Sequence, residues 1–357
     1  MATIYVGGAG GAPANNFISS LRASDRGYDV IGGCSSPTDL FLADVSRGHL
    51  LPGARAPGYA ERLLKILRDE RPDFLHVQHD YEVLAISELR DEIHALGVKT
   101  FLPAPQTVRD CVDKFASYAI WEKAGVPVPR TIRVDDESDL VSAFAELGPS
   151  LWLRATTGGG GRGAVPTDDI DFARMWISRF DGWGAFTAAE QLTADTVTWS
   201  SLWLDGDLVV AQTRRRRSWS FGDRTLSGVT GVTAVGETDA DPRVDETALA
   251  AIRAIDPRPN GIFSVDMTLD RDGLPRPTEI NIARFFTTIG FFTAAGLNMP
   301  EIYCELGLQG RSIWTGATIN PLPKGLVWIR GMDVPPQLHR REELDELVRT
   351  GMLRRAP

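Results

Sequence analysis

Two carboxylates and one amide are spaced so that they could hold a metal ion. The segment 262–281 reads as a β-hairpin that turns at the Asp-Gly pair 272–273. In such a hairpin Asp266 faces Glu279 across the two strands, and Asn281 shares the face of Glu279. Oxygen ligands of this kind favour Mg²⁺, with Mn²⁺ as an alternative. A solvated acidic hairpin face accounts for these residues equally well.

A glycine-rich loop is the second feature with chemical potential. Strand-like residues 151–153 deliver Arg154, whose guanidinium could bind a phosphate through two hydrogen bonds. The loop that follows contains Gly158, Gly159, Gly160, Gly161, Arg162 and Gly163. Its backbone N–H groups could approach a phosphate, or it could close as a lid. The loop is not a Walker loop, because no Gly-Lys-Ser/Thr sequence follows it. The alternative to a phosphate-binding or lid loop is a disordered surface loop.

Four consecutive arginines, residues 214–217, follow a predicted strand over 208–213. Because side chains alternate along a strand, Arg214 and Arg216 point one way and the other two point the opposite way. One pair could face the γ-phosphate of a nucleotide while the other pair is solvated. A fully solvated basic run is at least as good an explanation for any single arginine.

The first hundred residues alternate between strand and helix signals. Strands are predicted at 4–6, 28–31, 73–77 and 98–102, and helices at 15–24, 59–70 and 82–96. This order indicates a parallel, doubly wound α/β sheet. The Gly-rich turn at 7–13 has Pro13 where a dinucleotide-binding fingerprint needs its third glycine, so we interpret it as a tight turn beside the site.

The pattern changes after a predicted helix over 108–124 and the stiff turn 125–129. Short strands and one small helix at 170–180 suggest an α+β module, and strands dominate from 188 to 281. Helices return after Thr293, and a strand at 326–329 and a helix at 341–350 close the chain. We therefore predict three units: 1–108, 109–187 and 188–357.

Composition limits the classes of partner. The chain has 357 residues, enough for two or three packed units, and a net charge of -9, which argues against nucleic acid. No apolar stretch is long enough to span a membrane, and residues 3–6 lead directly into a strand with no signal peptide before them. The cysteines, Cys34, Cys111 and Cys304, lack metal or disulfide spacing, so we expect reduced thiols in a cytoplasmic protein.

Taken in order, these features resemble the ATP-grasp superfamily. The likeness is to the branch that includes the ATP-grasp domains of carbamoyl phosphate synthase and carboxylate–amine ligases. It is carried by segments along nearly the whole chain: 79–82 (His-Asp-Tyr-Glu), 111–114 (Cys-Val-Asp-Lys), 124–131, 153–154 with the glycine loop, 189–192 (Ala-Glu-Gln-Leu) and 279–281 (Glu-Ile-Asn). Each segment is weak evidence alone, whereas their order and spacing are specific.

The resemblance implies a role for each matching residue. Lys114 and Arg154 would contact the nucleotide phosphates, and the glycine loop would cover them. Adenine would bind the hinge Glu190, Gln191 and Leu192, and the ribose would bind Asp195 or its neighbour Thr196. Asp266, Glu279 and Asn281 would hold Mg²⁺, with Arg214 or Arg216 near the γ-phosphate. The family places Pro-Arg directly after its Glu-x-Asn motif, whereas Arg284 here comes one residue later; it would still hold the acceptor carboxylate or the acyl phosphate.

The implied activity is that of a ligase that activates a small carboxylate as an acyl phosphate with ATP and joins it to an amine. An amino acid is the commonest substrate of this kind. Phe285, Phe286, Phe291 and Phe292 could line the acceptor pocket, although such a stripe is more often core. A phosphotransferase on the same fold and a non-catalytic nucleotide-binding protein are the alternatives, and the sequence leaves a homodimer open.

Overall fold

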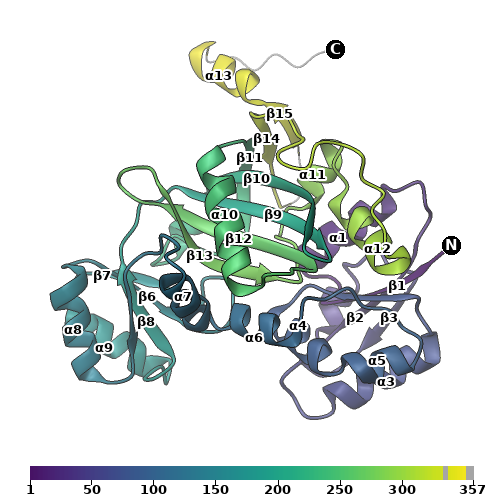
Figure 1. Cartoon of the computed structure of the whole chain (residues 1–357), viewed down its shortest axis with the longest axis horizontal. Helices are drawn as coiled ribbons and strands as arrows, with labels where there is room; N and C mark the ends of the chain where they lie inside the picture. Colours follow the sequence, from purple (N-terminus) through teal and green to yellow (C-terminus); the bar gives the residue numbers. More distant parts are fainter. Residues whose placement is uncertain (333–336, 351–357) are drawn as a thin grey trace.

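The N-terminal part of the chain forms a parallel four-stranded sheet (Figure 1). We describe a computed structural model in which residues 1–332 and 337–350 are placed. The strand order is β3-β2-β1-β4, and every neighbouring pair is parallel. The strands are β1 (Thr3–Gly7), β2 (Asp29–Cys34), β3 (Arg47–Leu50) and β4 (Phe74–Val77). The helices are α1 (Ala12–Arg22), α2 (Pro37–Leu40), α3 (Tyr59–Glu70), α4 (Asp80–Glu88) and α5 (Arg90–Ala95).

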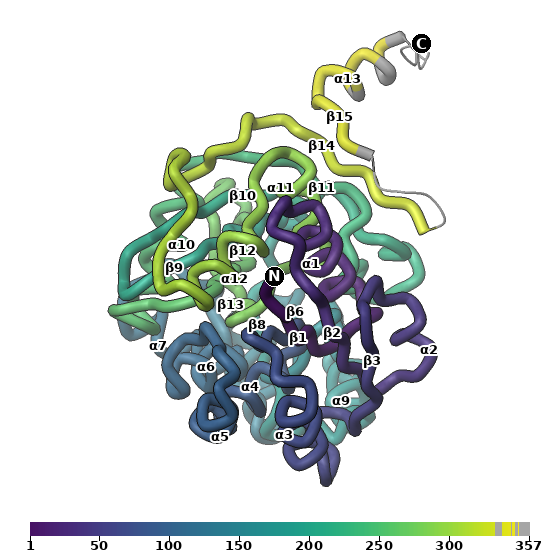
Figure 2. The backbone as a smooth tube through the Cα atoms, turned by 90° about the vertical axis from the view of Figure 1, so that its right-hand side faces the viewer, coloured from purple at the N-terminus to yellow at the C-terminus, as the bar shows by residue number. Residues whose placement is uncertain are grey.

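Alternating side chains of this sheet belong to two different cores. Tyr5 packs into the core that contains the buried face of α3. Ile4 and Val6 pack instead with α1 and with α12 (Met299–Gln309), which comes from the far end of the chain (Figure 2). Helices therefore cover both faces, which confirms the predicted doubly wound arrangement.

Three sequence predictions in this region were wrong in detail. The predicted strand at 98–102 makes only one bridge, from Lys99 to Phe74, and the fourth strand is β3 on the opposite edge. The predicted helix at 82–96 divides at Leu89 into α4 and α5. The predicted helix at 108–124 divides into α6 (Pro105–Val112) and α7 (Lys114–Lys123), because Asp113 is extended and its carboxylate accepts hydrogen bonds from the first backbone amides of α7.

A small α+β module follows, and it carries the glycine loop. Its antiparallel sheet has the order β5-β8-β6-β7, with two helices packed against it in a separate core. The elements are β5 (Thr131–Val134), α8 (Glu137–Leu147), β6 (Leu151–Ala155), β7 (Val165–Thr167), α9 (Ile170–Arg179) and β8 (Phe186–Glu190). The glycine loop connects β6 to β7, so an antiparallel pair anchors both of its ends.

The largest sheet has seven strands, and all its pairs are antiparallel. Its order is β13-β12-β9-β10-β11-β14-β15. The strands are β9 (Thr196–Leu204), β10 (Asp207–Trp219), β11 (Thr233–Asp239), β12 (Gly261–Leu269), β13 (Pro275–Ile282), β14 (Leu326–Ile329) and β15 (Gln337–Arg340). The helix α10 (Pro242–Ile255) packs on one face, and α11 (Gly290–Ala294) and α12 pack on the other.

The C-terminal segment reaches away from the body of the molecule. Helix α13 (Arg341–Thr350) follows β15 and stands clear of the sheets in both views (Figures 1 and 2). The predicted strand at 326–329 and helix at 341–350 are confirmed, whereas β15 was not foreseen. The three predicted units remain a prediction, and the end of the third lies outside the described residues.

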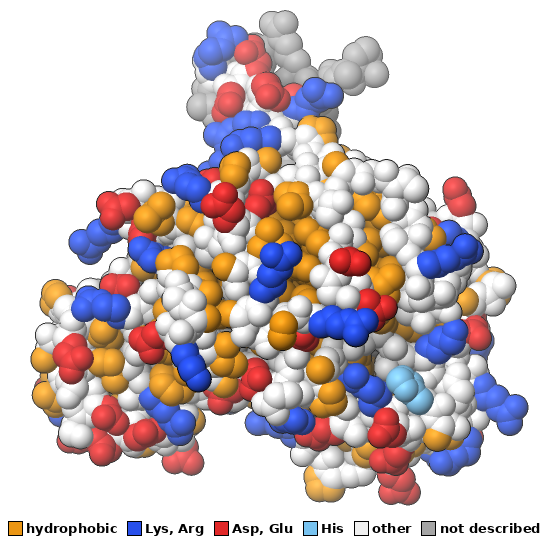
Figure 3. Space-filling view, viewed as in Figure 1, with side chains coloured by type: hydrophobic (Ala, Val, Ile, Leu, Met, Phe, Trp, Pro, Cys, Tyr) orange, Lys and Arg blue, Asp and Glu red, His pale blue; other side chains and the backbone are white. Residues whose placement is uncertain are grey.

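The surface carries charges of both signs, and the cysteines lie in the interior. Acidic and basic side chains are interspersed on the face shown in Figure 3. None of the described helices is long and apolar enough to cross a lipid bilayer. All three cysteines are buried and unpaired.

A buried carboxylate in the N-terminal sheet region makes the stability of the protein sensitive to pH. Only 8% of Glu82 is exposed. One of its oxygens accepts a hydrogen bond of 3.2 Å from Tyr59, and the other has no partner among the described residues. Burial raises the pKa of Glu82 from 4.5 to about 7.

We therefore expect Glu82→Gln to gain stability relative to the wild type as pH rises from 4.5 to 8. The folded wild type must ionise a buried group above pH 7, whereas its unfolded chain ionises at 4.5, so its stability falls across this window. The relative change should be about 3 kcal/mol, from 1.36 kcal/mol per pKa unit. Urea unfolding at several pH values measures it. The exposed Glu88, replaced by Gln, is the control, and parallel pH profiles for wild type and Glu82→Gln would contradict this account.

Candidate active site

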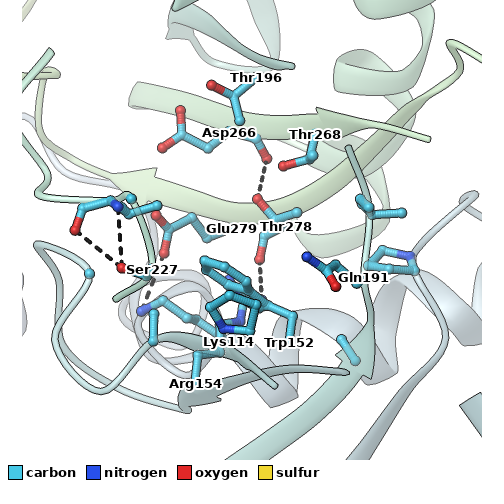
Figure 4. Close-up of a pocket in the computed structure, with 18 of the residues that line it drawn as sticks. Lys114, Trp152, Arg154, Gln191, Thr196, Ser227, Asp266, Thr268, Thr278 and Glu279 are labelled. Carbon is cyan, nitrogen blue, oxygen red and sulfur yellow. Dashed lines mark hydrogen bonds and ion pairs between the residues drawn. The ribbon is translucent and has the colours of Figure 1, made fainter. Parts of the chain in front are cut away.

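The main cavity lies between the small α+β module and the seven-stranded sheet. Its volume is about 380 Å³, and residues of β6, β12 and β13 face one another across it (Figure 4). Apolar walls come from Trp152 and Ala155 on one side and Met267 on the other. Cationic side chains, among them Lys114 and Arg216, line it as well. The cavity can therefore take a ligand with a flat apolar part and an anionic part.

The predicted pairing of the two carboxylates is confirmed by the strand register. Asp266 lies opposite Glu279, and Asn281 lies opposite Ser264. The register shifts by one residue after Asp266, because Met267 pairs with Pro277. The bulge lets the Thr278 hydroxyl donate a hydrogen bond of 3.1 Å to the backbone oxygen of Asp266. Both carboxylates line the cavity beside this bulge.

Three cations surround the carboxylate pair. Lys114 Nζ lies 3.3 Å from a Glu279 oxygen and donates a hydrogen bond of 2.5 Å to the carbonyl of Gly158. Arg154 donates a hydrogen bond of 2.6 Å to the backbone oxygen of Thr278. An Arg216 nitrogen lies 3.8 Å from Asp266. Burial lowers the pKa of Arg154 and of Arg216, so each favours contact with an anion that would restore its charge balance.

The carboxylate pair fits a divalent cation that also has oxygen ligands from outside the protein. One Asp266 oxygen accepts from the Thr198 hydroxyl, and the other accepts a hydrogen bond of 3.0 Å from the Asn281 amide nitrogen. Asn281 would therefore have to turn its oxygen towards the ion. No group of three or more His, Cys, Asp or Glu side chains gathers for a metal anywhere in residues 1–332 and 337–350. A set of two carboxylates and one amide suits Mg²⁺, which completes its shell with phosphate and water.

The glycine loop meets a second loop over this end of the cavity. Gly158, Gly160 and Gly161 have positive φ angles, a conformation that side chains disfavour. A Cβ atom at Gly161 would lie 2.9 Å from the backbone oxygen of Val229. A Cβ atom at Gly231 would lie 2.6 Å from the Cα atom of Gly160. The second loop comprises residues 220–232 between β10 and β11. Its close approach to the glycine loop therefore requires residues without side chains at the points of contact.

A smaller cavity of about 100 Å³ adjoins the first. The two cavities share Asp266, Glu279, Arg216, Trp219 and parts of both loops. The smaller cavity alone contacts Arg214, Asn281, Arg284, Phe286 and Thr287. The carboxylate pair thus stands at a junction between a large, mostly apolar space and a small, cationic one.

Arg284 connects this junction to the N-terminal sheet region. Its Nε donates to Asp80 at the start of α4, and its Nη2 donates to the Asn281 oxygen. Burial opposes the charge on Arg284, yet the Asp80 carboxylate holds the pKa of its guanidinium above the usual value. Ala283 has a φ of 54°, an uncommon value for a residue with a Cβ, and this left-handed turn returns Arg284 to Asn281 despite the extra residue in the motif.

The run of four arginines lies within β10 and does not follow it, which corrects the predicted strand end at 213. Arg214 and Arg216 face the small cavity, as the alternation predicted. Arg215 and Arg217 point the other way and are paired with Asp239 and Glu237. The outer pair therefore neutralises acidic side chains of β11.

Most of the remaining predicted site residues also line the main cavity, but two do not. Glu190, Gln191, Leu192 and Arg162 line it, and the Glu190 carboxylate turns to the backbone and side chain of Arg130. Asp195 is exposed and outside the cavity wall, whereas Thr196 is in it. Gly163 packs against Phe186 in the module core.

Sequence analysis did not predict that the 220–232 loop and the end of β10 line the cavities. Trp219 lines both cavities, and its ring lies 3.8 Å from the Arg216 guanidinium. Ser227 and Val229 line the main cavity. The glycines at 222, 228 and 231 were the available signal. Of the phenylalanine stripe, Phe285, Phe291 and Phe292 are core, and Phe286 also contacts the small cavity.

Solved structures share the fold of this chain over most of its length. An L-amino acid ligase from Bacillus licheniformis is similar with a TM-score of 0.68 and 13% identity, over 92% of this chain and 79% of that chain. An N5-carboxyaminoimidazole synthetase from Staphylococcus aureus, complexed with ADP, has a TM-score of 0.70 and 15% identity, over 93% and 82%. The biotin carboxylase domain of the Hydrogenobacter thermophilus 2-oxoglutarate carboxylase, in complex with MgADP, has a TM-score of 0.68 and 14% identity, over 92% and 74%.

No protein-family model matches the sequence. The structural likeness nevertheless shows that the chain has the ATP-grasp fold, as its motifs predicted. Proteins with this fold among the matches include both ligases and carboxylases, so the fold alone leaves the reaction open.

Proposed function

We propose that this protein is an ATP-dependent carboxylate–amine ligase that works through an acyl phosphate. The observation that carries the proposal is the junction of two unequal cavities at Asp266, Glu279 and Arg216. The large cavity suits a nucleotide, with its base between Trp152 and Met267 and its phosphates directed to the junction. The small cavity then places an anionic acceptor beside the terminal phosphate.

The chain's own residues bind, orient and shield the reacting groups. Lys114 and Arg154 would neutralise the nucleotide phosphates, and Arg216 would face the γ-phosphate at the junction. Asp266, Glu279 and Asn281 would hold Mg²⁺, which supplies charge neutralisation on the phosphates when it is bound. The two loops that meet above the junction would exclude water, which would otherwise hydrolyse an acyl phosphate.

The proposed reaction balances without a protein nucleophile. A carboxylate oxygen of the acid attacks the γ-phosphorus, the bond between that phosphorus and its bridging oxygen breaks, and ADP leaves. The amine nitrogen then attacks the acyl carbon, the carbon–oxygen bond to phosphate breaks, and inorganic phosphate and one proton are released. Arg284 would hold the acyl phosphate from the small cavity.

The test is ADP release by the purified protein with Mg·ATP, screened against pooled carboxylates with and without pooled amines. A ligase requires both pools for full release, and separating the pools identifies both substrates. Release with a hydroxyl compound alone would instead assign a phosphotransferase. Tight Mg·ATP binding with no release from any pool would contradict the ligase proposal and favour a binding protein. A cytoplasmic location and a homodimer remain predictions.

A further inference from the structure

Arg214 is a buried cation with no ion-pair partner. Only 1% of the residue is exposed, and within the described chain no carboxylate oxygen lies within 4.0 Å of its guanidinium. Its Nη atoms donate to the hydroxyls of Thr198, Thr233 and Thr288 at 2.7–3.1 Å, and its Nε has no hydrogen-bond partner in that same part of the structure. An uncompensated charge at this depth is costly unless a ligand neutralises it.

The neighbouring arginines already have acidic partners. Arg216 lies beside Asp266, and Arg284 is bound by Asp80. The guanidinium of Arg214 instead lies over the ring of Phe286, 4.4 Å from its centre. Burial, together with the nearby charge of Arg216, lowers the pKa of Arg214 to about 9, and the more distant carboxylate of Asp266 offsets only part of this shift. An anion in the small cavity would oppose both effects.

Two anions could neutralise Arg214: the γ-phosphate of the nucleotide and a substrate carboxylate. The position of Arg214 distinguishes between them. Arg216 lines both cavities, which places it at the junction where a γ-phosphate would lie. Arg214 lines only the small cavity and does not contact the nucleotide space. A carboxylate that enters the small cavity is therefore the nearer candidate.

The size of the small cavity limits what that carboxylate can carry. Its volume is about 100 Å³. A water-sized atom needs at least roughly 10–15 Å³ of such space, so the cavity holds no more than about eight non-hydrogen atoms. The ring of Phe286 lines the small cavity alone, whereas the glycine loop and Val229 line both cavities.

We propose that Arg214 binds the carboxylate of the acid substrate, and that this acid is a small one of about eight non-hydrogen atoms or fewer. This inference rests on the proposed function. It resolves the roles of the two inward arginines: Arg216 contacts the γ-phosphate, and Arg214 contacts the acid. The ring of Phe286 sets the upper limit on the length of the acid.

A graded series of acids tests the size limit. The series is formate, acetate, propionate, butyrate, hexanoate and octanoate, with glycine, alanine, glutamate and phenylalanine as 2-amino acids. Hydroxylamine serves as a small, uncharged amine at pH 7.5, and hydroxamate and ADP are both measured. We expect kcat/KM to fall at least 100-fold beyond about eight non-hydrogen atoms, and Phe286→Leu to move that limit upward. Release only with the longer acids would overturn this inference and leave the ligase proposal intact, whereas release with no acid would overturn both.

Substitution of the two arginines distinguishes a contact with the acid from a contact with the γ-phosphate. Arg214→Met removes the charge and fills the space with an apolar side chain, so the fold should survive. We expect the KM of the acid to rise at least 30-fold and the Kd of Mg·ATP to change less than threefold, with partial recovery in Arg214→Lys. Arg216→Met should weaken Mg·ATP more than Mg·ADP. If Arg214→Met weakens Mg·ATP selectively over Mg·ADP, Arg214 contacts the γ-phosphate and the assignment is wrong.

Discussion

Glu279→Gln should abolish most of the Mg²⁺-dependent binding of ATP and reduce kcat/KM by roughly 10²–10³-fold, the scale for removing one group that stabilises a transition state. The substitution keeps the size of the side chain and removes one of the two charges that face each other across β12 and β13. Lys114 then loses its carboxylate partner at 3.3 Å. The site also loses one of the negative charges that would hold the metal ion bound to the triphosphate. Calorimetric titration of ATP with and without Mg²⁺ measures the binding effect.

The same hairpin supplies a matched control. Asp272 is an exposed carboxylate at the turn, and Asp272→Asn makes the same change of charge away from the cavity. Asp272→Asn should bind Mg·ATP as the wild type does. Normal Mg·ATP binding by a folded Glu279→Gln variant would show that the metal assignment is wrong.

Asp80→Asn should destabilise the protein by about 3 kcal/mol, the scale for removing one partner of a buried ion pair. The side chains of Asp80 and Arg284 are each 16% exposed, so solvent replaces little of the lost interaction. Burial alone would raise the pKa of Asp80, but Arg284 outweighs it and holds that pKa below its usual value. Loss of the carboxylate leaves Arg284 charged and buried, and it frees the arginine from its place at Asn281.

A double-mutant cycle isolates this pair. Asp80→Asn combined with Arg284→Gln removes both charges, so the double variant should be more stable than the sum of the single effects predicts. Chemical denaturation of the four proteins gives the coupling free energy. The surface pair Lys65–Asp69, whose side chains are more than half exposed, is the control and should show no measurable coupling. Additive effects at Asp80 and Arg284 would mean that the two residues are not coupled.

Short-range patterns were sufficient to predict the hairpin that carries the candidate metal set. The Asp-Gly turn and the alternation of side chains fixed Asp266 opposite Glu279 without knowledge of the rest of the chain. Between Asp266 and the turn, each pair is offset by one residue from the predicted register. The bulge after Asp266 compensates for this offset. The predicted pairing therefore holds at the site although the turn is centred differently.

Interactions between distant segments were beyond sequence reasoning. The contact of Asp80 with Arg284 joins residues 204 positions apart, and no local pattern specifies it. The break at Asp113 depends on a carboxylate cap that competes with continued helix, which apolar periodicity does not register. The approach of residues 220–232 to the glycine loop is visible only when β10 and β6 are placed in space.

The arginine run shows how burial changes an interpretation. A solvated basic run was one of two interpretations of the four adjacent charges, yet Arg214 is almost fully buried and Arg215 is paired with Asp239. Alternation along β10 predicted which pair would share a face. The charge balance on each face depends on β11 and on the small cavity, which the local sequence does not describe.

The most direct test of the central claim follows an oxygen atom from the acid to phosphate. The acid identified by the ADP-release screen is labelled with ¹⁸O in its carboxylate and incubated with Mg·ATP, the amine and the protein. The proposed acyl phosphate predicts that each inorganic phosphate released carries one ¹⁸O atom, detected by mass spectrometry. Unlabelled phosphate formed together with the amide would show that the carboxylate does not attack the γ-phosphorus and would contradict the proposed reaction.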